Sequence, residues 1–369
     1  MVEWKKLGDV CSVFDGTHQT PKYTESGVKF VSVENIDNLY FTNKYISKMA
    51  YSENYKIKPQ KGDVLMTRIG DVGRCAIITK DEPIAFYVSL ALLRPNPEFI
   101  LCNYLKHIIE SKTGRIELRK RTLLTAVPLK INLGEIGKIR IPIPSLEEQK
   151  RIVGILDTFT DSIENLKQQI AQRRKQYEHY RDQLLFSFER NVIVSDVSTF
   201  AKGRIDVKCL NADNYVSVEN LLKDKAGKTI SSVVPTEGNW VMYKENDILI
   251  GNIRPYLRKI WFSDRCGGTN GDVLVIRPNE KVIPRFLFFV LSSERFFIYY
   301  NQTAKGGKMP RGEKARALQF DFYLPSTKEQ SRIVSILDTF EASISNLEAQ
   351  LAQRQKQYEY YRNQLLTFE

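Results

Sequence analysis

The sequence predicts an α+β chain in which two mixed α/β modules are separated by two long helices that form an antiparallel coiled coil. Three observations predict this fold class. A helical segment is written twice, the segments before its two copies repeat in order, and both copies carry a heptad pattern of apolar residues. The expected segments are module 1 (1–144), helix 1 (145–190), module 2 (191–325) and helix 2 (326–369).

The repeated helical segment is the clearest of these signals. Residues 149–185 and 330–366 align at an offset of 181 residues and share the words RIV, ILDTF, AQR, KQYE and QLL. Fainter matches precede them: VSVEN at 31–35 recurs at 216–220, GDVL at 62–65 resembles NDIL at 246–249, and RPN at 94–96 recurs at 277–279. Chance explains one such match but not three in the same order. Each half is therefore a divergent module followed by a nearly invariant helix.

The modules show short β-rich runs and few helices, which favours an α+β fold. Module 1 is expected to have strands near 29–33, 63–67, 75–79, 89–94 and 138–143, with a helix near 98–111 followed by a basic loop. Module 2 repeats that order, with strands near 215–218, 247–250, 259–262 and 272–277, a helix near 284–300 and a basic, glycine-rich loop.

Each long helix is expected to begin at a capping box directly after a proline, at Ser145-x-x-Glu148 and Ser326-x-x-Glu329. Apolar residues then recur at steps of four and three, which is the seam of a coiled coil. An arginine interrupts each seam, either as a snorkelling side chain or as a polar layer that fixes register. The seam residues are Ile152, Leu156, Phe159, Ile163, Leu166, Ile170 and Arg173 in helix 1, and Ile333, Leu337, Phe340, Ile344, Leu347, Leu351 and Arg354 in helix 2.

The two helices are expected to pack on each other. A helix of about 42 residues is roughly 60 Å long, so it cannot bury its apolar stripe inside one small domain. If the modules are equivalent, helix 1 ends where module 2 begins and helix 2 ends near Met1, which makes the pair antiparallel. The resulting arrangement is almost circular and has a pseudo-twofold axis across the helix pair.

Composition and motifs argue against an enzyme and against a membrane protein. The 55 Lys and Arg residues exceed the 43 Asp and Glu residues and leave a net charge of +12, which favours polyanionic partners. The five scattered cysteines suit a reducing cytoplasm, and no stretch is apolar enough to span a bilayer. Phosphate-loop, dinucleotide-binding, zinc-protease and amino-methyltransferase motifs are missing, and the three histidines lie in different elements. No catalytic residue and no metal site are therefore expected.

Loops rich in Arg, Lys, Asn, Gln and Thr are the candidate DNA-binding segments, because these side chains bond base edges and phosphates. Solvated surface charge is the alternative for any one of them, but they cluster at matching places in both modules. The candidates are Thr17, His18, Gln19, Arg68, Arg74, Arg119, Lys120 and Arg121 in module 1, and Arg204, Asn252, Arg254, Tyr256, Arg258, Lys305, Lys308 and Arg311 in module 2.

Several words of the sequence resemble those of a known family. They are the strand–proline–helix junctions IPIPSLEEQKRI at 141–152 and LPSTKEQ at 324–330, the entry WKKLGDV at 4–10, the loop GTH at 16–18 and KMPR at 308–311. On these motifs, and over its whole length, the chain is similar to the specificity (S) subunit of a type I restriction–modification system.

The resemblance implies that the modules are target-recognition domains, each reading one half of a bipartite site in double-stranded DNA, while the helix pair sets the spacer. It implies two methyltransferase (modification) subunits that bind S-adenosylmethionine, and two restriction subunits with ATP-driven translocation that can join them. No cofactor is expected in this chain itself.

Two other classes of function stay open. One is a coiled-coil scaffold with two peptide-binding modules and no DNA binding, which would lack the steep salt dependence of DNA binding. The other is a self-sufficient methyltransferase, which would bind S-adenosylmethionine as an isolated chain.

Overall fold

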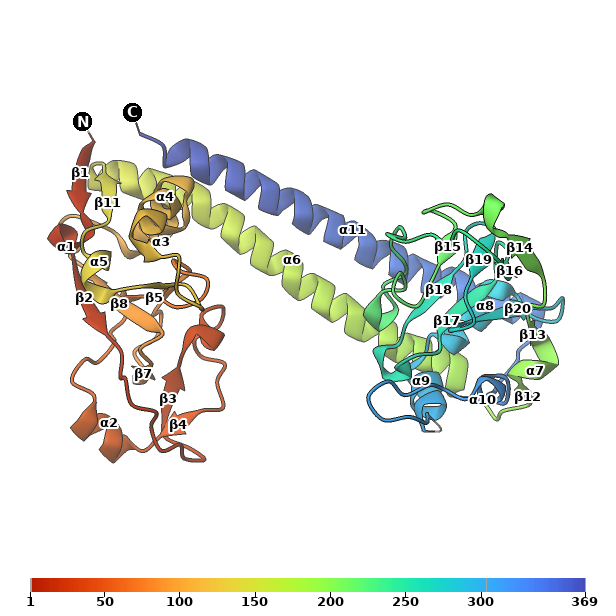
Figure 1. Cartoon of the computed structure of the whole chain (residues 1–369). Helices are drawn as coiled ribbons and strands as arrows, with labels where there is room; N and C mark the ends of the chain where they lie inside the picture. The colour runs from red at the N-terminus through yellow and green to blue at the C-terminus, as the bar shows by residue number, and fades with distance from the viewer. Residues whose placement is uncertain (1, 303, 369) are drawn as a thin grey trace. The chain divides into compact units, whose positions relative to one another are not determined.

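The computed structural model describes residues 2–302 and 304–368, and the chain divides into two compact units. Unit 1 comprises Met1–Gln168 and Glu348–Glu369, and unit 2 comprises Gln169–Leu347. Figure 1 shows the long helices α6 (Leu146–Phe186) and α11 (Thr327–Leu365), and each of them contributes residues to both units. The return of residues 348–369 to the unit that holds the first residues is the closure expected from the sequence.

Unit 1 is built around a four-stranded sheet of order β2-β8-β5-β6, a three-stranded sheet of order β4-β3-β7, and the pair β1-β11. Strand β3 runs parallel to β7, whereas the pairs of the four-stranded sheet are antiparallel. The elements are β1 (Glu3–Lys6), α1 (Leu7–Val10), β2 (Cys11–Asp15), β3 (Val28–Val31), η1 (Val33–Asn35), β4 (Tyr45–Ile46), α2 (Lys48–Asn54), β5 (Val64–Thr67), β6 (Cys75–Ile77), β7 (Ile84–Phe86), β8 (Leu90–Pro95), α3 (Cys102–Glu110), α4 (Lys112–Arg121), β9 (Thr122–Leu123), β10 (Lys130–Ile131), α5 (Leu133–Ile136) and β11 (Arg140–Ile143).

Unit 2 repeats this topology except in its second sheet, which has four strands in the order β14-β16-β19-β15. Its sheet of order β13-β20-β17-β18 corresponds to β2-β8-β5-β6, β12-β21 corresponds to β1-β11, and β15 runs parallel to β19 as β3 does to β7. The elements are β12 (Val192–Ile193), α7 (Val194–Val197), β13 (Ser198–Phe200), β14 (Arg204–Asp206), η2 (Val207–Cys209), β15 (Tyr215–Val216), η3 (Lys223–Lys225), β16 (Asn239–Tyr243), β17 (Ile248–Gly251), η4 (Pro255–Leu257), β18 (Ile260–Phe262), β19 (Gly267–Thr269), β20 (Val273–Pro278), α8 (Pro284–Leu291), α9 (Glu294–Asn301), α10 (Lys314–Leu318) and β21 (Asp321–Phe322). The two divergent modules therefore share one fold, as the faint repeats predicted.

The helical part of each module differs from the sequence prediction in one respect. The region expected to be one helix and a basic loop in module 1 is two helices, α3 and α4, and the predicted helix 284–300 is α8 and α9. The reason is a serine at each break. The hydroxyl oxygen of Ser111 accepts a hydrogen bond from the Gly114 amide at 3.2 Å, and that of Ser293 accepts one from the Phe296 amide at 3.2 Å. These side chains start the second helix, so the chain turns without a long loop.

The long helices begin where the sequence predicted. The Glu148 amide donates to the Ser145 hydroxyl at 3.3 Å, and the Glu329 amide donates to the Ser326 hydroxyl at 3.4 Å. The two glutamate side chains pair with arginines one turn further along, and Arg151 lies 2.7 Å from Glu148. The serine half of each predicted capping box is thus formed, and each glutamate joins an i,i+3 ion pair.

The helices run antiparallel within each unit, as predicted. In unit 1 the first half of α6 packs on the last half of α11, where Phe159 stacks on Tyr361 with ring centroids 5.3 Å apart. In unit 2 the equivalent rings, Tyr180 and Phe340, stack at 5.6 Å. The seam positions are buried or half-buried, and most positions between them are exposed.

The two seam arginines lie over aromatic rings of the opposite helix. The guanidinium of Arg354 is 5.7 Å from the ring centre of Phe159 in unit 1, and that of Arg173 is 5.9 Å from Phe340 in unit 2. These are cation–π contacts. Each arginine thus contacts the partner helix rather than only reaching for solvent.

Each core takes in the start of one long helix and the end of the other. Ile152 and Leu156 of α6 and Leu366 are fully buried in the core of unit 1. The equivalent residues at an offset of 181, Ile333, Leu337 and Leu185, are buried in the core of unit 2. Burial of these side chains fixes the helix ends to the modules, since large aliphatic core residues contribute about 2–5 kcal/mol each relative to alanine.

A buried glutamine joins each long helix to its module. The Gln149 side chain accepts a hydrogen bond from the Leu101 amide at 3.0 Å and donates to the carbonyls of Phe99 and Pro144 at 2.8 and 3.0 Å. The Gln330 side chain accepts from the Ile283 amide at 2.8 Å and donates to the Pro325 carbonyl at 2.9 Å. These hydrogen bonds explain why a glutamine stands at the same position in both copies of the helix, at Gln149 and Gln330.

Beside each glutamine, a second polar contact differs between the units. In unit 1, His107 lies 2.8 Å from Asp157 and 3.0 Å from the Tyr358 hydroxyl, so it bridges both long helices. In unit 2 the equivalent aspartate, Asp338, accepts instead from Arg285 at 2.8 Å, and Arg285 also donates to Glu341 of the same helix at 2.5 Å. The helices are alike, but each module holds them with its own side chains.

Candidate nucleic-acid interface

The loop after β2 and the loop after β5 meet at Asp15 in module 1. Asp15 accepts a hydrogen bond from Arg68 at 2.5 Å and lies 2.9 Å from the His18 ring. The side chain of Arg68 is 12% exposed, whereas that of His18 is 70% exposed. The structure therefore brings these two candidates together, with His18 at the surface and Arg68 beneath it.

Backbone contacts hold the 16–19 loop in place. The Thr17 amide donates to the Phe86 carbonyl at 3.1 Å, and the side chain of Gln19, two residues later, is exposed. A Cβ on Gly16 would lie 2.5 Å from the carbonyl carbon of Tyr87, so only glycine fits this approach. The loop is a fixed platform for exposed polar side chains.

Acidic residues neutralise the second arginine of this region. Arg74 pairs with Asp37, and Arg115 lies 3.2 Å from Asp71 of the same loop. The hydrogen bond to Asp37 raises the pKa of Arg74 above its ordinary value. Surface ion pairs of this kind are worth at most about 1 kcal/mol, so Arg74 can exchange its carboxylate for a phosphate at little cost.

Helix α4 carries Arg119, Lys120 and Arg121, but only the first is unpaired among the described residues. Lys120 and Arg121 donate to the buried carboxylate of Glu117 at 2.5 and 3.0 Å. Burial raises the pKa of Glu117, but hydrogen bonds from Lys120 and from the Arg140 amide, together with the Arg121 charge, outweigh it and lower that pKa overall. Arg119 is exposed and available for an external anion.

In module 2, four candidates lie on the loop between β17 and β18: Asn252, Arg254, Tyr256 and Arg258. Arg258 donates to Asp224 at 2.5 Å and to Glu294 at 3.0 Å, so its charge is already balanced. Tyr256 is 51% exposed. Arg254 has a φ of +52°, a left-handed conformation, and its backbone amide donates to the Pro310 carbonyl at 2.7 Å. This last contact ties the loop to the basic segment that follows α9.

Asn252 corrects the sequence prediction. Its side chain is 4% exposed, and its amide oxygen accepts a hydrogen bond from the buried Tyr300 hydroxyl. An amide so placed satisfies a core tyrosine and has no access to a base, because buried polar groups need their internal partners. We therefore remove Asn252 from the candidate residues.

The remaining candidates of module 2 do not form one cluster. Lys305 and Lys308 are exposed and form no ion pair within the described part of the chain, while Arg311 lies 3.1 Å from Asp272. Arg204 is exposed on β14, the outer strand of the order β14-β16-β19-β15, whereas Arg254 lies on a loop of the other sheet, between β17 and β18.

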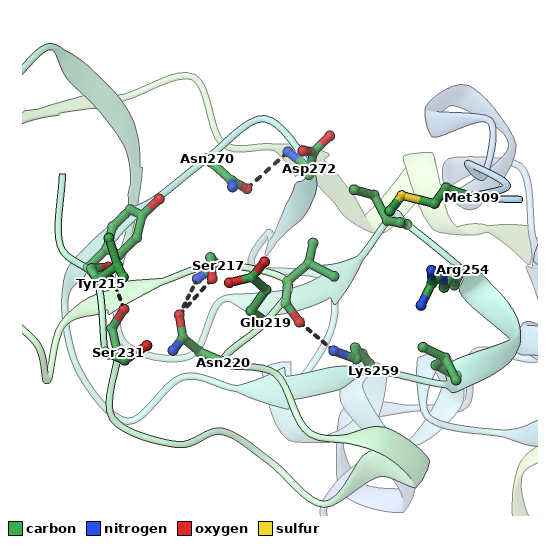
Figure 2. Close-up of a pocket in the computed structure, with 15 residues that line it drawn as sticks. Tyr215, Ser217, Glu219, Asn220, Ser231, Arg254, Lys259, Asn270, Asp272 and Met309 are labelled. Atoms are coloured by element: carbon green, nitrogen blue, oxygen red, sulfur yellow. Dashed lines mark hydrogen bonds between the residues drawn. The ribbon is translucent and has the colours of Figure 1, made fainter.

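A cavity of about 370 Å³ lies beside the repeated VSVEN word of module 2, and Figure 2 shows the side chains that line it. Arg254 and Lys259, from the loop between β17 and β18, and Glu219, from the segment after β15, face the same space. Burial lowers the pKa of Lys259, whose ammonium group donates to the Val218 carbonyl at 2.6 Å. A smaller cavity of about 250 Å³ lies at the same word in module 1, lined by Ser32 and others.

The sequence could not identify the residues that hold these candidates. Asp15, Asp37 and Glu294 lie dozens of residues away from the arginines they pair with, and no local pattern marks them, whereas the spacing of Glu117 from Lys120 and Arg121 is readable from the sequence. Within the described residues, no group of His, Cys, Asp or Glu is arranged to hold a metal ion. No helix in that part of the chain is both long and apolar enough to cross a bilayer.

Comparison with protein families gives a match over both halves. A family model described as "Type I restriction modification DNA specificity domain" matches residues 1–173 and 190–355. A type I restriction enzyme specificity subunit from Escherichia coli, EcoR124I/EcoR124II, is 28% identical over 256 residues, which are 63% of this chain and 63% of the relative. A putative one from Haemophilus influenzae is 29% identical over 65% of this chain and 66% of the relative. The matches to these two relatives span just under two thirds of their lengths.

Other relatives match over nearly the whole chain. A putative type I specificity subunit from Mycoplasma pneumoniae is 24% identical over 98% of this chain and 96% of its own length. The crystal structure of a type I restriction–modification S subunit from M. genitalium superposes with a TM-score of 0.62 at 13% identity, covering 100% of this chain and 97% of that one. A chain of another type I R-M system gives a TM-score of 0.55 at 16% identity over 99% and 96%. At these identities the structures establish a shared fold.

Proposed function

This chain belongs to the type I restriction–modification DNA specificity family, and on that premise we propose that it reads a bipartite DNA site for partner enzymes. Each module contacts one half of the site, and the helix pair sets the number of unspecified base pairs between them. The chain carries no catalytic residues of its own. It directs modification subunits that bind S-adenosylmethionine and methylate the site, and ATP-dependent restriction subunits can join them.

The observation that carries this proposal is the repetition of one fold. Both modules share the strand order β2-β8-β5-β6 and β13-β20-β17-β18, and the DNA specificity family covers both. Yet the side chains at equivalent surface positions differ, as expected if each module meets a different base sequence. Exposed cations on both modules, and the net charge of +12, favour a polyanionic partner.

The first test is the methylated sequence itself. The chain is expressed with its modification subunit in a host without other DNA methylation, and methylated bases are mapped by single-molecule sequencing. We expect a motif of two short specified blocks around a fixed spacer. Replacing residues 191–325 by the corresponding module of another family member should change one block only. A continuous motif, or a change in both blocks, would contradict the proposal that each module reads one half of the site.

The second test measures the spacer. Deleting residues 163–169 and 344–350 removes one heptad from each helix, and seven residues keep the seam in phase. The pair becomes about 10 Å shorter, which corresponds to about 3 base pairs at ~3.4 Å each. We expect a spacer shortened by about that number, or no methylation if the twist of DNA turns one half-site away. Deleting 163–169 alone is the control, because it leaves the helices unequal and should abolish methylation. A spacer of unchanged length in the double deletion would refute the proposal that the helix pair sets the spacer.

A further inference from the structure

Module 1 carries a hairpin whose base is buried and whose tip is apolar and exposed. The hairpin, residues 122–131, contains β9 and β10 and follows directly from α4. At its base, Ile131 is fully buried and the Thr122 hydroxyl donates to the Leu118 carbonyl at 2.9 Å. At its tip, Val127 is 99% exposed and Leu124 is 55% exposed. The base makes the hairpin stable, so the apolar tip is not needed for folding.

Module 2 has the same hairpin at the same place, and its described residues are 304–312. It follows α9 as the first follows α4, and it lies at the offset of 181 that relates the long helices. Three backbone contacts recur in the two modules. The hydrogen bond from the Gly70 amide to the Leu129 carbonyl, at 2.8 Å, matches that from the Arg254 amide to the Pro310 carbonyl, at 2.7 Å. The bond from the Ile131 amide to the Arg68 carbonyl matches that from the Gly312 amide to the Asn252 carbonyl, both at 3.0 Å, and the β-bridge Ile69–Lys130 matches Ile253–Arg311. The two hairpins are therefore structural equivalents.

The two tips have opposite chemistry. Leu124 and Val127 of module 1 correspond to Lys305 and Lys308 of module 2, and all four side chains are exposed. None of the four side chains belongs to a hydrophobic core, so the difference changes the surface that each module presents to its surroundings.

We propose that the 122–131 hairpin enters the major groove of the half-site read by module 1 and packs Leu124 and Val127 against thymine methyl groups. This inference rests on the proposed function and deepens it by naming the bases. The edges of bases in the major groove are hydrogen-bonding groups except for the thymine C5-methyl, which is their one apolar feature. An aliphatic tip therefore matches thymine, whereas a lysine tip matches the acceptors of guanine or a phosphate.

Charges beside the tip fit the same partner. Arg119 comes just before the hairpin on α4, and Lys130 lies at its base on β10; both are exposed and without an ion pair among the described residues. Cations on both sides of an apolar tip suit a groove whose walls are phosphates and whose floor carries methyl groups. An apolar protein partner has no need of this flanking charge.

The test uses the complex with its modification subunits and duplexes that carry its methylation motif. Thymines of one half-site at a time are replaced by deoxyuridine, which removes only the methyl group, and affinity is measured by fluorescence anisotropy at fixed salt. In one half-site, we expect binding to weaken about fourfold for each methyl group that is lost. The double variant Leu124→Ser/Val127→Ser should lose this sensitivity to deoxyuridine in that half-site and keep its response in the other.

Phe41→Ser is the matched control, because Phe41 is 83% exposed in another loop of module 1. It should keep the full deoxyuridine effect. A half-site without thymine, or a deoxyuridine effect equal in wild type and double variant, would overturn the inference while leaving the proposed function intact. Weaker assembly with the modification subunits in the double variant, with the deoxyuridine effect unchanged in the complex that still forms, would instead identify the tip as a protein-docking surface. Absence of any bipartite motif would refute the proposed function itself.

Discussion

Replacing Gln149 by alanine is expected to destabilise unit 1 by about 3 kcal/mol. The Gln149 side chain is fully buried and is the hydrogen-bond partner of three backbone groups, the Leu101 amide and the Phe99 and Pro144 carbonyls. Each buried group left without a partner costs about 1–3 kcal/mol, and water entering the vacated space keeps each loss near the lower limit. Gln330→Ala leaves two such groups in unit 2 without a hydrogen-bond partner and should lower the free energy of unfolding there by about 2 kcal/mol.

Hydrogen–deuterium exchange in increasing urea, followed by mass spectrometry, measures the two units separately, which one unfolding midpoint cannot do for a chain of two units. Gln149→Ala should lower the protection of peptides from residues 100–150, and Gln330→Ala that of peptides from 280–335. Gln172→Ala is the control, since Gln172 is exposed on α6. A loss of protection no greater than that of the control, or one shared equally by both units, would show that the buried glutamine is not what joins helix to module.

Three further changes test other contacts. Glu117 has a pKa below its ordinary 4.5, so its stabilising effect is complete above that pH and is lost as the pH falls through the lower folded value; Glu117→Gln should flatten the acid side of the unfolding midpoint below about pH 4.5. Arg354→Met removes a cation over Phe159 and should cost less than about 1 kcal/mol in thermal unfolding, whereas replacing a polar layer that fixes helix register should raise the stability. Gly312→Ala would place a Cβ 2.3 Å from the ring of Tyr300, which is fully buried, and should reduce stability by about 2–3 kcal/mol and lower soluble yield.

The scaffold could be predicted from the sequence because the chain contains its own comparison. Ser145 and Ser326 begin the two long helices as the paired words indicated, and Phe159 and Phe340 lie on the seam that the heptads predicted. The shared order of strands in the two modules was also visible as faint matches in register. Duplicated segments keep what the fold requires, so agreement between them indicates structure.

The candidate interface could be predicted only in part, because composition does not say which way a side chain points. Arg68 and Arg258 were predicted as DNA-binding candidates from their charge, but the fold places carboxylates beside them that already balance that charge. Asn252 lies in a polar loop and yet faces the core. The run around Val127 was expected only as part of a basic loop, because its hydrophobicity alone gives no sign that a hairpin projects into solvent there. These features depend on tertiary contacts between distant segments.

Unit 1 needs residues 348–369, and this has a consequence for how the protein is made. His107 bonds to Tyr358, which the ribosome adds 251 residues later. The core of the nascent module 1 therefore stays incomplete, without Tyr358, Leu365 and Leu366, until the end of the chain has been synthesised. A premature stop codon near residue 347 would leave the coding region of module 1 intact but expose its core to proteases. Loss of the 3′ end of the gene would then destabilise first the module that the 5′ end encodes.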